Sequence, residues 1–145
     1  MLIRFTKVSD DQHRVAVSRS NGSTEQATLP SRGFLRHDFA HLVVEECVGL
    51  EKGYWGSVAS GARLDGSDMG GPEIQLAEAL AGPVQTLLRI DGSLDQFETT
   101  LARVLPDRDC ADLAKQVQQR GKQLLGHWRA TPFGESMEVE WAEHE

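Results

Sequence analysis

Apolar and polar residues alternate along the first thirty positions of the chain, which predicts three short strands. Residues 2–8 and 13–19 are rich in apolar and β-branched side chains, and a polar turn separates them. The Asn21-Gly22 pair that follows is the strongest short signal for a β-hairpin. Residues 24–29 supply the third segment, so this part of the chain is expected to fold as a β-meander.

The alternation returns near the end of the chain, where Met137, Val139 and Trp141 would face one side of a strand. Glu138 and Glu140 would face the other side. A strand with this acidic face can pair with the basic N-terminal meander, so that each glutamate meets an Arg or Lys. We therefore expect one small antiparallel sheet built from the two ends of the chain.

Between these two parts, apolar residues recur at the spacing of amphipathic helices. The predicted helices cover residues 35–48, 73–89, 94–105 and 110–125. Gly49 and Gly126 stand where a glycine would end the first and the last of them. The Gly82-Pro83 pair is expected to kink or split the second. The fold class is therefore α+β, a small antiparallel sheet packed against about four helices.

Length and composition suit a single domain that spans residues 1–145. Hydrophobic residues make up 39% of the chain, and no stretch approaches the ~18 consecutive apolar residues of a membrane span. The N-terminus lacks the apolar segment of a secretory signal peptide, so we expect a cytoplasmic protein. Cys47 and Cys110 belong to no metal or redox motif, which favours two reduced and mostly buried thiols.

The net charge of -7 is unevenly distributed along the chain. Residues 1–37 carry six Lys or Arg and three acidic residues, whereas the remaining 108 residues carry nine and nineteen. An acidic surface repels the phosphates of nucleic acids and the head groups of anionic membranes. We therefore expect neither nucleic acid nor a membrane as a partner.

Candidate chemistry is confined to one predicted helix, in the segment HDFAHLVVE at residues 37–45. His37 and His41 are four residues apart, so both imidazoles lie on one helical face, and Glu45 follows one turn later. Two imidazoles at this spacing can bind one metal ion, and a carboxylate often completes the ligand set. The sequence thus predicts a divalent-metal site, with zinc as the leading ion.

The geometry of a helix limits this set. His37 and Glu45 are about 12 Å apart along the axis at ~1.5 Å per residue, so one ion is not expected to bind all three side chains. An ion would take His37 with His41, or His41 with Glu45, and Glu45 would otherwise orient His41. Asp38 is the candidate for positioning a metal-bound water in hydrolysis. A third ligand must come from elsewhere, and the candidates are His13, His127, Asp65 and Asp68.

The same helix also fits a purely structural role, in which Glu45 simply accepts a hydrogen bond from His41. The protein would then be a non-catalytic interaction module that associates with itself, for example as a homodimer. Residues 53–62 mix large aromatic and very small side chains and fit either a helix or a loop. In this alternative the segment 54–56, with its two aromatic residues, contributes to the contact surface, and Trp55 is the residue to test.

Two enzyme families resemble the histidine segment over a few residues. His37-Asp38-Phe39-Ala40-His41 is similar to the zincin helix H-E-x-x-H, with Asp38 in place of the glutamate general base. The His37-Asp38 doublet also resembles the HD phosphohydrolases. Their pattern requires a helical histidine upstream, whereas the upstream histidine of this chain is in a predicted strand. Both resemblances imply metal-dependent hydrolysis.

A longer resemblance covers residues 2 to about 62. The order is a strand, an Asn-Gly turn, a second strand, an H-D-x-x-H-x-x-V-E helix, Gly-Leu and an aromatic G-[FY]-W-G segment. This order is similar to a family of small uncharacterised bacterial proteins, and the resemblance brings no activity with it. The matching residues are Asn21, Gly22, His37, Asp38, His41, Val44, Glu45, Gly49, Leu50, Tyr54, Trp55 and Gly56.

Overall fold

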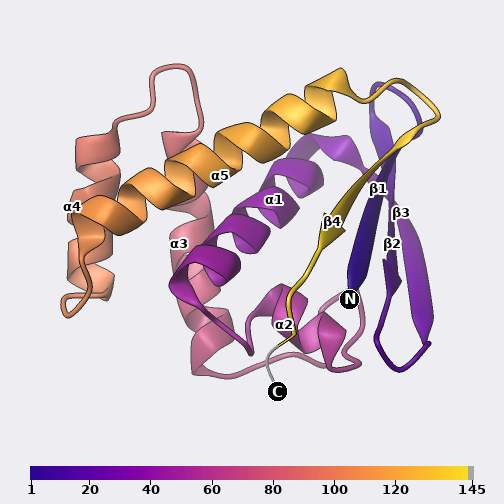
Figure 1. Cartoon of the computed structure of the whole chain (residues 1–145), viewed down its shortest axis with the longest axis horizontal. Helices are drawn as coiled ribbons and strands as arrows, with labels where there is room; N and C mark the ends of the chain where they lie inside the picture. The colour runs from indigo at the N-terminus through magenta and orange to yellow at the C-terminus, as the bar shows by residue number, and fades with distance from the viewer. Residues whose placement is uncertain (144–145) are drawn as a thin grey trace.

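Four strands form one antiparallel sheet, and five helices lie to one side of it in the described part of the chain (Figure 1). The structure, a computed structural model, describes residues 1–143. The strand order is β3-β2-β1-β4, so the last strand joins the N-terminal meander. The predicted α+β fold is confirmed, with one helix more than expected. In chain order the elements are β1 (Leu2–Lys7), β2 (Gln12–Ser18), β3 (Thr24–Pro30), α1 (Ser31–Val48), α2 (Tyr54–Ala59), α3 (Pro72–Leu87), α4 (Leu94–Val104), α5 (Cys110–Ala130) and β4 (Ser136–Glu140).

One face of the sheet is apolar and the other is polar, as the alternation predicts. Ile3, Phe5 and Val15 are almost completely buried beneath the helices. On the opposite face Arg4 of β1 lies beside Glu138 of β4, and its guanidinium donates to the carboxylate at 2.9 Å. This confirms the predicted pairing of the acidic last strand with the basic meander. Because both side chains are half exposed, the ion pair adds little stability, and burial of the apolar face supplies most of it.

Helix α1 packs against the buried face of the sheet and forms the centre of the core. Its Phe39 meets Phe5 of β1 edge to face, with ring centroids 5.0 Å apart. The helix ends where the sequence predicts, because Gly49 has a φ of +85° and adopts the left-handed conformation that suits glycine. It begins earlier than predicted, at Ser31, with a kink in its first turn.

Two predicted helix ends are absent. Helix α3 runs through Gly82-Pro83 without a break, so the pair does not split the helix. Pro83 deprives only the carbonyl of Ala79 of its helical donor, and Ala79 is exposed, so water can donate there instead. Helix α5 continues past Gly126 for one more turn, although a glycine costs a helix about 1 kcal/mol relative to alanine. Packing of Trp128 against the core offsets that cost.

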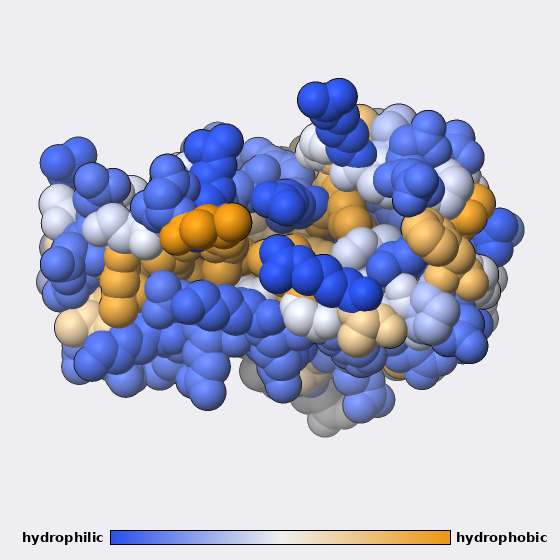
Figure 2. All heavy atoms as spheres, turned by 90° about the horizontal axis from the view of Figure 1, so that it is seen from above, coloured by the Kyte–Doolittle hydropathy of each residue, from blue (hydrophilic) through white to orange (hydrophobic). Residues whose placement is uncertain are grey.

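The surface is mostly hydrophilic. Seen from above, hydrophilic residues cover most of the molecule and hydrophobic ones show in a hollow along the middle of this face (Figure 2). Only a few large hydrophobic side chains of residues 1–143 are well exposed, among them Phe34, Ile90 and Phe133. In the same part of the chain, no helix combines the length and the apolar character needed to cross a membrane.

Candidate metal centre

Two histidines of α1 lie one turn apart on the side of the helix that contacts α3. The ring centroids of His37 and His41 are 4.7 Å apart. The side chain of His41 is 2% exposed, whereas that of His37 is 37% exposed. The spacing of four residues therefore places both imidazoles at the edge of the core, one inside it and one at the surface.

Glu78 of α3 completes a group of three donors that could hold a metal ion. Its Oε1 atom is 2.9 Å from Nε2 of His41 and 3.6 Å from Nε2 of His37. One ligand atom from each of the three residues lies within 4.8 Å of the others. Zinc binds imidazole nitrogen and carboxylate oxygen at about 2.0–2.2 Å, so small movements of the two more exposed side chains, His37 and Glu78, would close the group around an ion.

Glu45 lies on the opposite side of the His41 ring from Glu78. Its Oε2 atom accepts a hydrogen bond from Nδ1 of His41 at 2.9 Å, while Glu78 meets Nε2. The same carboxylate also accepts the backbone N–H groups of Tyr54 and Trp55, both at 2.8 Å. Of the two roles that the sequence allows for Glu45, this position suits the orienting one, because the carboxylate fixes the imidazole with Nε2 toward the other donors.

The charge of His41 follows from its two carboxylate neighbours. Burial would lower the pKa of His41, but the hydrogen bond and negative charge of Glu45, together with those of Glu78, outweigh it and raise the pKa. Nε2 of His41 lies 2.9 Å from Oε1 of Glu78, and a proton on Nε2 would bridge the two side chains. A divalent cation would replace that proton and keep both contacts favourable.

The aromatic segment after α1 is shaped around Glu45. Its Tyr54-Trp55-Gly56 part opens helix α2, whose first N–H groups point at the buried carboxylate, a favourable place for an anion. A Cβ atom on Gly53 would clash with the carboxyl carbon of Glu45, so only glycine leaves room for this carboxylate. A Cβ on Gly56 would meet the backbone of the preceding loop in the same way.

The prediction that the aromatic segment contributes to a contact surface is wrong for Trp55. The side chain is completely buried and packs edge to face on Phe5, with ring centroids 6.0 Å apart. Its indole N–H donates to the backbone carbonyl of Asp38 at 3.1 Å, which ties α2 to the histidine helix. Trp55 is therefore a core residue, and its hydrogen bond to Asp38 fixes α2 against the helix that bears the histidines.

The three donors and Asp38 share one pocket of about 470 Å³. Asp38 is 9% exposed, and its carboxyl has no hydrogen-bond partner among residues 1–143. Burial raises the pKa of this carboxyl to about 7, against a smaller lowering effect of His41. A buried carboxyl that has no hydrogen-bond partner among the described residues and opens into a pocket is available for chemistry.

Gln85 of α3 lies at Nδ1 of His37, just as Glu45 lies at Nδ1 of His41. Its amide lies 3.1 Å from Nδ1 of His37, and either amide atom can face the ring. If Nε2 of His37 held a cation, Nδ1 would carry the proton, and the amide oxygen of Gln85, turned toward the ring, would accept its hydrogen bond. Glu78 and Gln85 are seven residues apart, so they project from the same face of α3.

We expect Gln85→Met to weaken zinc binding by about 10-fold or more, because loss of an orienting partner of a metal-bound histidine costs roughly 10–100-fold. Methionine keeps the length of the side chain and the helix propensity, so the fold should be unchanged. Zinc titration by calorimetry measures the effect. Gln75→Met, at an exposed position of the same helix, is the matched control and should bind zinc as the wild type does.

The structure brings His37, His41 and Asp38 together. The third donor is Glu78, a residue that the sequence analysis did not single out. Of the four candidates considered, Asp65 lies on the pocket wall, and Asp68 accepts the N–H of Arg63 in the adjoining loop. The other two histidines lie elsewhere. The signal for Glu78 was present but weak: a carboxylate and an amide two turns apart on the border of an amphipathic helix.

His13 and His127 have other surroundings. His13 is fully buried, with Nδ1 3.1 Å from the hydroxyl of Ser31 and its ring against Trp128. Burial lowers the pKa of His13, so the ring stays neutral in the core. His127 is exposed in the last turn of α5. Neither belongs to the donor group.

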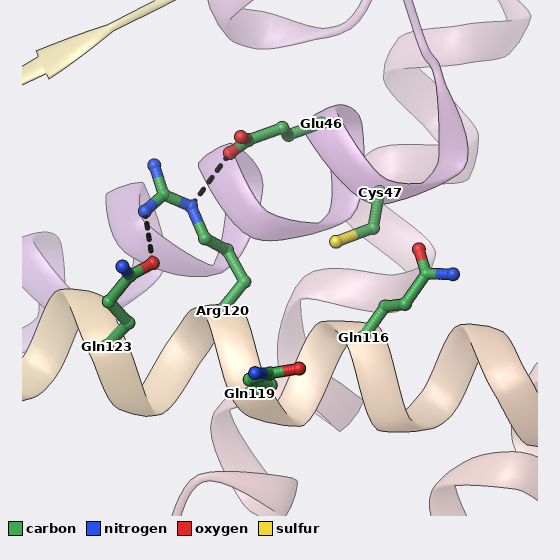
Figure 3. Close-up of a pocket in the computed structure, with 6 residues that line it drawn as sticks. All are labelled: Glu46, Cys47, Gln116, Gln119, Arg120 and Gln123. Carbon is green, nitrogen blue, oxygen red and sulfur yellow. Dashed lines mark hydrogen bonds and ion pairs between the residues drawn. The ribbon is translucent and has the colours of Figure 1, made fainter.

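A second pocket, of about 480 Å³, lies between α1 and α5 (Figure 3). Figure 3 shows an ion pair across it, from Arg120 to Glu46, and the thiol of Cys47 on the side of the pocket where Gln116 and Gln119 lie. Burial and the charge of Glu46 raise the pKa of Cys47 to about 11, so the thiol stays protonated and is a poor nucleophile. Cys47 and Cys110 are both free, as predicted. The group of residues that could hold a metal ion lies in the histidine pocket instead.

Comparisons with known proteins add no identification: no protein-family model, no curated protein and no solved structure matches the chain.

Proposed function

We propose that the protein is a metal-dependent hydrolase. A divalent ion would be held by Nε2 of His37, Nε2 of His41 and the carboxylate of Glu78, and Asp38 would act as the general base. The observation that carries this proposal is the juxtaposition of three metal donors with the Asp38 carboxyl, which has no hydrogen-bond partner among residues 1–143, all in the wall of one pocket. Zinc is the leading ion, because two histidines and one glutamate are an established ligand set of catalytic zinc.

The number of donors supports a catalytic role over a structural one. A structural zinc site is closed by four protein ligands, whereas a catalytic site has three and leaves one position for water or substrate. Here the described residues supply three donors, and all three line the pocket. The ion would supply Lewis-acid activation of a water, and Asp38 would accept the proton that this water loses.

The residues around the donors support the same function. Glu45 and Gln85 hold the two imidazoles by their Nδ1 atoms, the arrangement that sets the tautomer and orientation of metal-binding histidines. Asp38 follows His37 directly, so one helix presents both the ion and the base to the pocket. The zincin helix combines the same functions, with a longer carboxylate at the second position.

Metal uptake and hydrolysis measured on the same samples test this function. Protein treated with a chelator and reloaded with zinc should hold about one ion per chain and hydrolyse an activated ester, and the chelated protein should do neither. His37→Gln should lose both properties but keep its fold, because its side chain is partly exposed. His127→Gln, which changes an exposed histidine on α5, is the matched control. A wild-type chain that takes up no zinc, manganese or iron contradicts the proposal.

A further inference from the structure

We infer that the substrate is a small uncharged molecule in which an apolar group adjoins a carbonyl that is hydrolysed, as in an ester or amide. This inference rests on the proposed function and adds the class of substrate to it. Three observations carry it: the apolar walls of the pocket, the sign of its charges, and the hydrogen bonds that fix its shape.

The walls of the pocket are mainly apolar and come from four separate parts of the chain. They are Leu29 at the end of β3, Phe34 at the start of α1, Leu64 and Met69 in the loop before α3, and Ile74 in its first turn. Phe34 is half exposed at the surface. An apolar group bound beside the ion would cover these side chains, and the burial of apolar surface would favour binding.

The charged side chains that line the pocket are all acidic apart from the two histidines. They are Asp38, Asp65 and Glu78, and neither Lys nor Arg occurs among the described lining residues. Asp65 and Glu78 alone match the two positive charges of one divalent ion, and Asp38 adds negative charge whenever it is deprotonated. Sites that bind phosphate esters place Arg, Lys or a second metal ion around the phosphate. A phosphorylated or carboxylated substrate would therefore be repelled here.

The loop wall of the pocket is held by hydrogen bonds at its base. The hydroxyl of Tyr54 donates to the carbonyl of Leu64, and the N–H of Leu64 donates to Glu25 at 3.0 Å. The guanidinium of Arg19, itself paired with Glu25, donates to the carbonyl of Ala62 at 2.9 Å. The apolar wall is thus formed in advance of binding, which favours discrimination by shape.

The size of the pocket favours a small molecule over a polypeptide. Its volume is about 470 Å³. At the ~30 Å³ that one water occupies in the liquid, it has room for on the order of 15 non-hydrogen atoms. An acyl chain of five or six carbons with its leaving group fits this space.

Binding of hydroxamates to the zinc-loaded protein tests the inference without relying on turnover. A hydroxamate binds a metal through two oxygens and places its chain on the apolar walls. Each methylene that becomes buried is worth about 4-fold in affinity, so hexanohydroxamate should bind at least 10-fold more tightly than acetohydroxamate. It should also bind at least 10-fold more tightly than hexylphosphonate, which carries an alkyl chain one methylene longer on an anionic head. Calorimetry measures all three.

Phe34→Ser should reduce the preference for the longer hydroxamate by about 5-fold and leave zinc content unchanged. Phe133→Ser, at an exposed phenylalanine that does not line the pocket, is its control. A zinc-loaded protein that shows no chain-length preference, or that binds hexylphosphonate as tightly, overturns this inference and leaves the proposed function standing. A protein that takes up no zinc overturns the proposed function and this inference with it.

Discussion

The Glu45→Gln substitution is expected to lower the free energy of unfolding by about 3–5 kcal/mol, the cost of breaking a buried charged network by removing one partner. The carboxylate of Glu45 is 1% exposed and accepts hydrogen bonds from Nδ1 of His41 and from the N–H groups of Tyr54 and Trp55. Glutamine has one oxygen where glutamate has two. Its NH₂ group must face an N–H donor whichever way the amide turns, and that donor is left buried without an acceptor.

Urea unfolding followed by tryptophan fluorescence measures this loss, because Trp55 is buried beside the network. Glu46→Gln is the matched control: it makes the same change at the next residue, where the side chain is 45% exposed and pairs with Arg120. The control should cost about 0–1 kcal/mol, as exposed ion pairs do. Equal effects of the two substitutions would contradict the role assigned to Glu45.

Asp38→Asn is expected to lower the rate of metal-dependent hydrolysis by about 10²–10⁴-fold, the usual contribution of a general base. Asparagine has the shape of aspartate but cannot accept the proton of a water. The carboxyl of Asp38 has no hydrogen-bond partner among residues 1–143, so the fold and the zinc content should be unchanged. Rates and metal content measured on the same preparation separate the loss of the base from the loss of the ion.

Asp65→Asn is the control for this substitution, because Asp65 lines the same pocket but is exposed in the loop before α3. It should change the rate by less than about 5-fold, within the range of surface charge effects. A rate for Asp38→Asn within 3-fold of the wild type would show that another group takes the proton. Loss of zinc from Asp38→Asn would instead make this carboxylate a metal ligand.

The parts of the site that the sequence predicted are those that one helix brings together. His37 and His41 share a helical face through local geometry alone, and Glu45 follows from the same periodicity. Glu78 lies on α3, 37 residues after His41 in the chain. Its place beside His41 depends on how α1 and α3 pack, which no local pattern specifies.

The fold shows the same division between local and distant effects. Alternation identified all four strands, and the burial of Ile3 and the exposure of Arg4 follow from it. The requirement for Gly53 was invisible in the sequence, because the group that excludes a Cβ there is the carboxyl of a residue in the preceding helix. The continuation of α5 past Gly126 likewise depends on tertiary packing, which outweighed the local preference of glycine.

Zinc binding by Glu78→Gln tests the central claim most directly. Glu78 is the donor that joins the two helices, and its side chain is 55% exposed, so the substitution should not disturb the core. Calorimetry of the metal-free wild type should show about one zinc site per chain. Glu78→Gln should weaken that site by about 100-fold or more, since even loss of an orienting partner costs roughly 10–100-fold. Glu135→Gln, at an exposed glutamate before β4, should bind as the wild type does. Equal affinity in Glu78→Gln and the wild type, or no binding by the wild type, would contradict a metal centre on His37, His41 and Glu78.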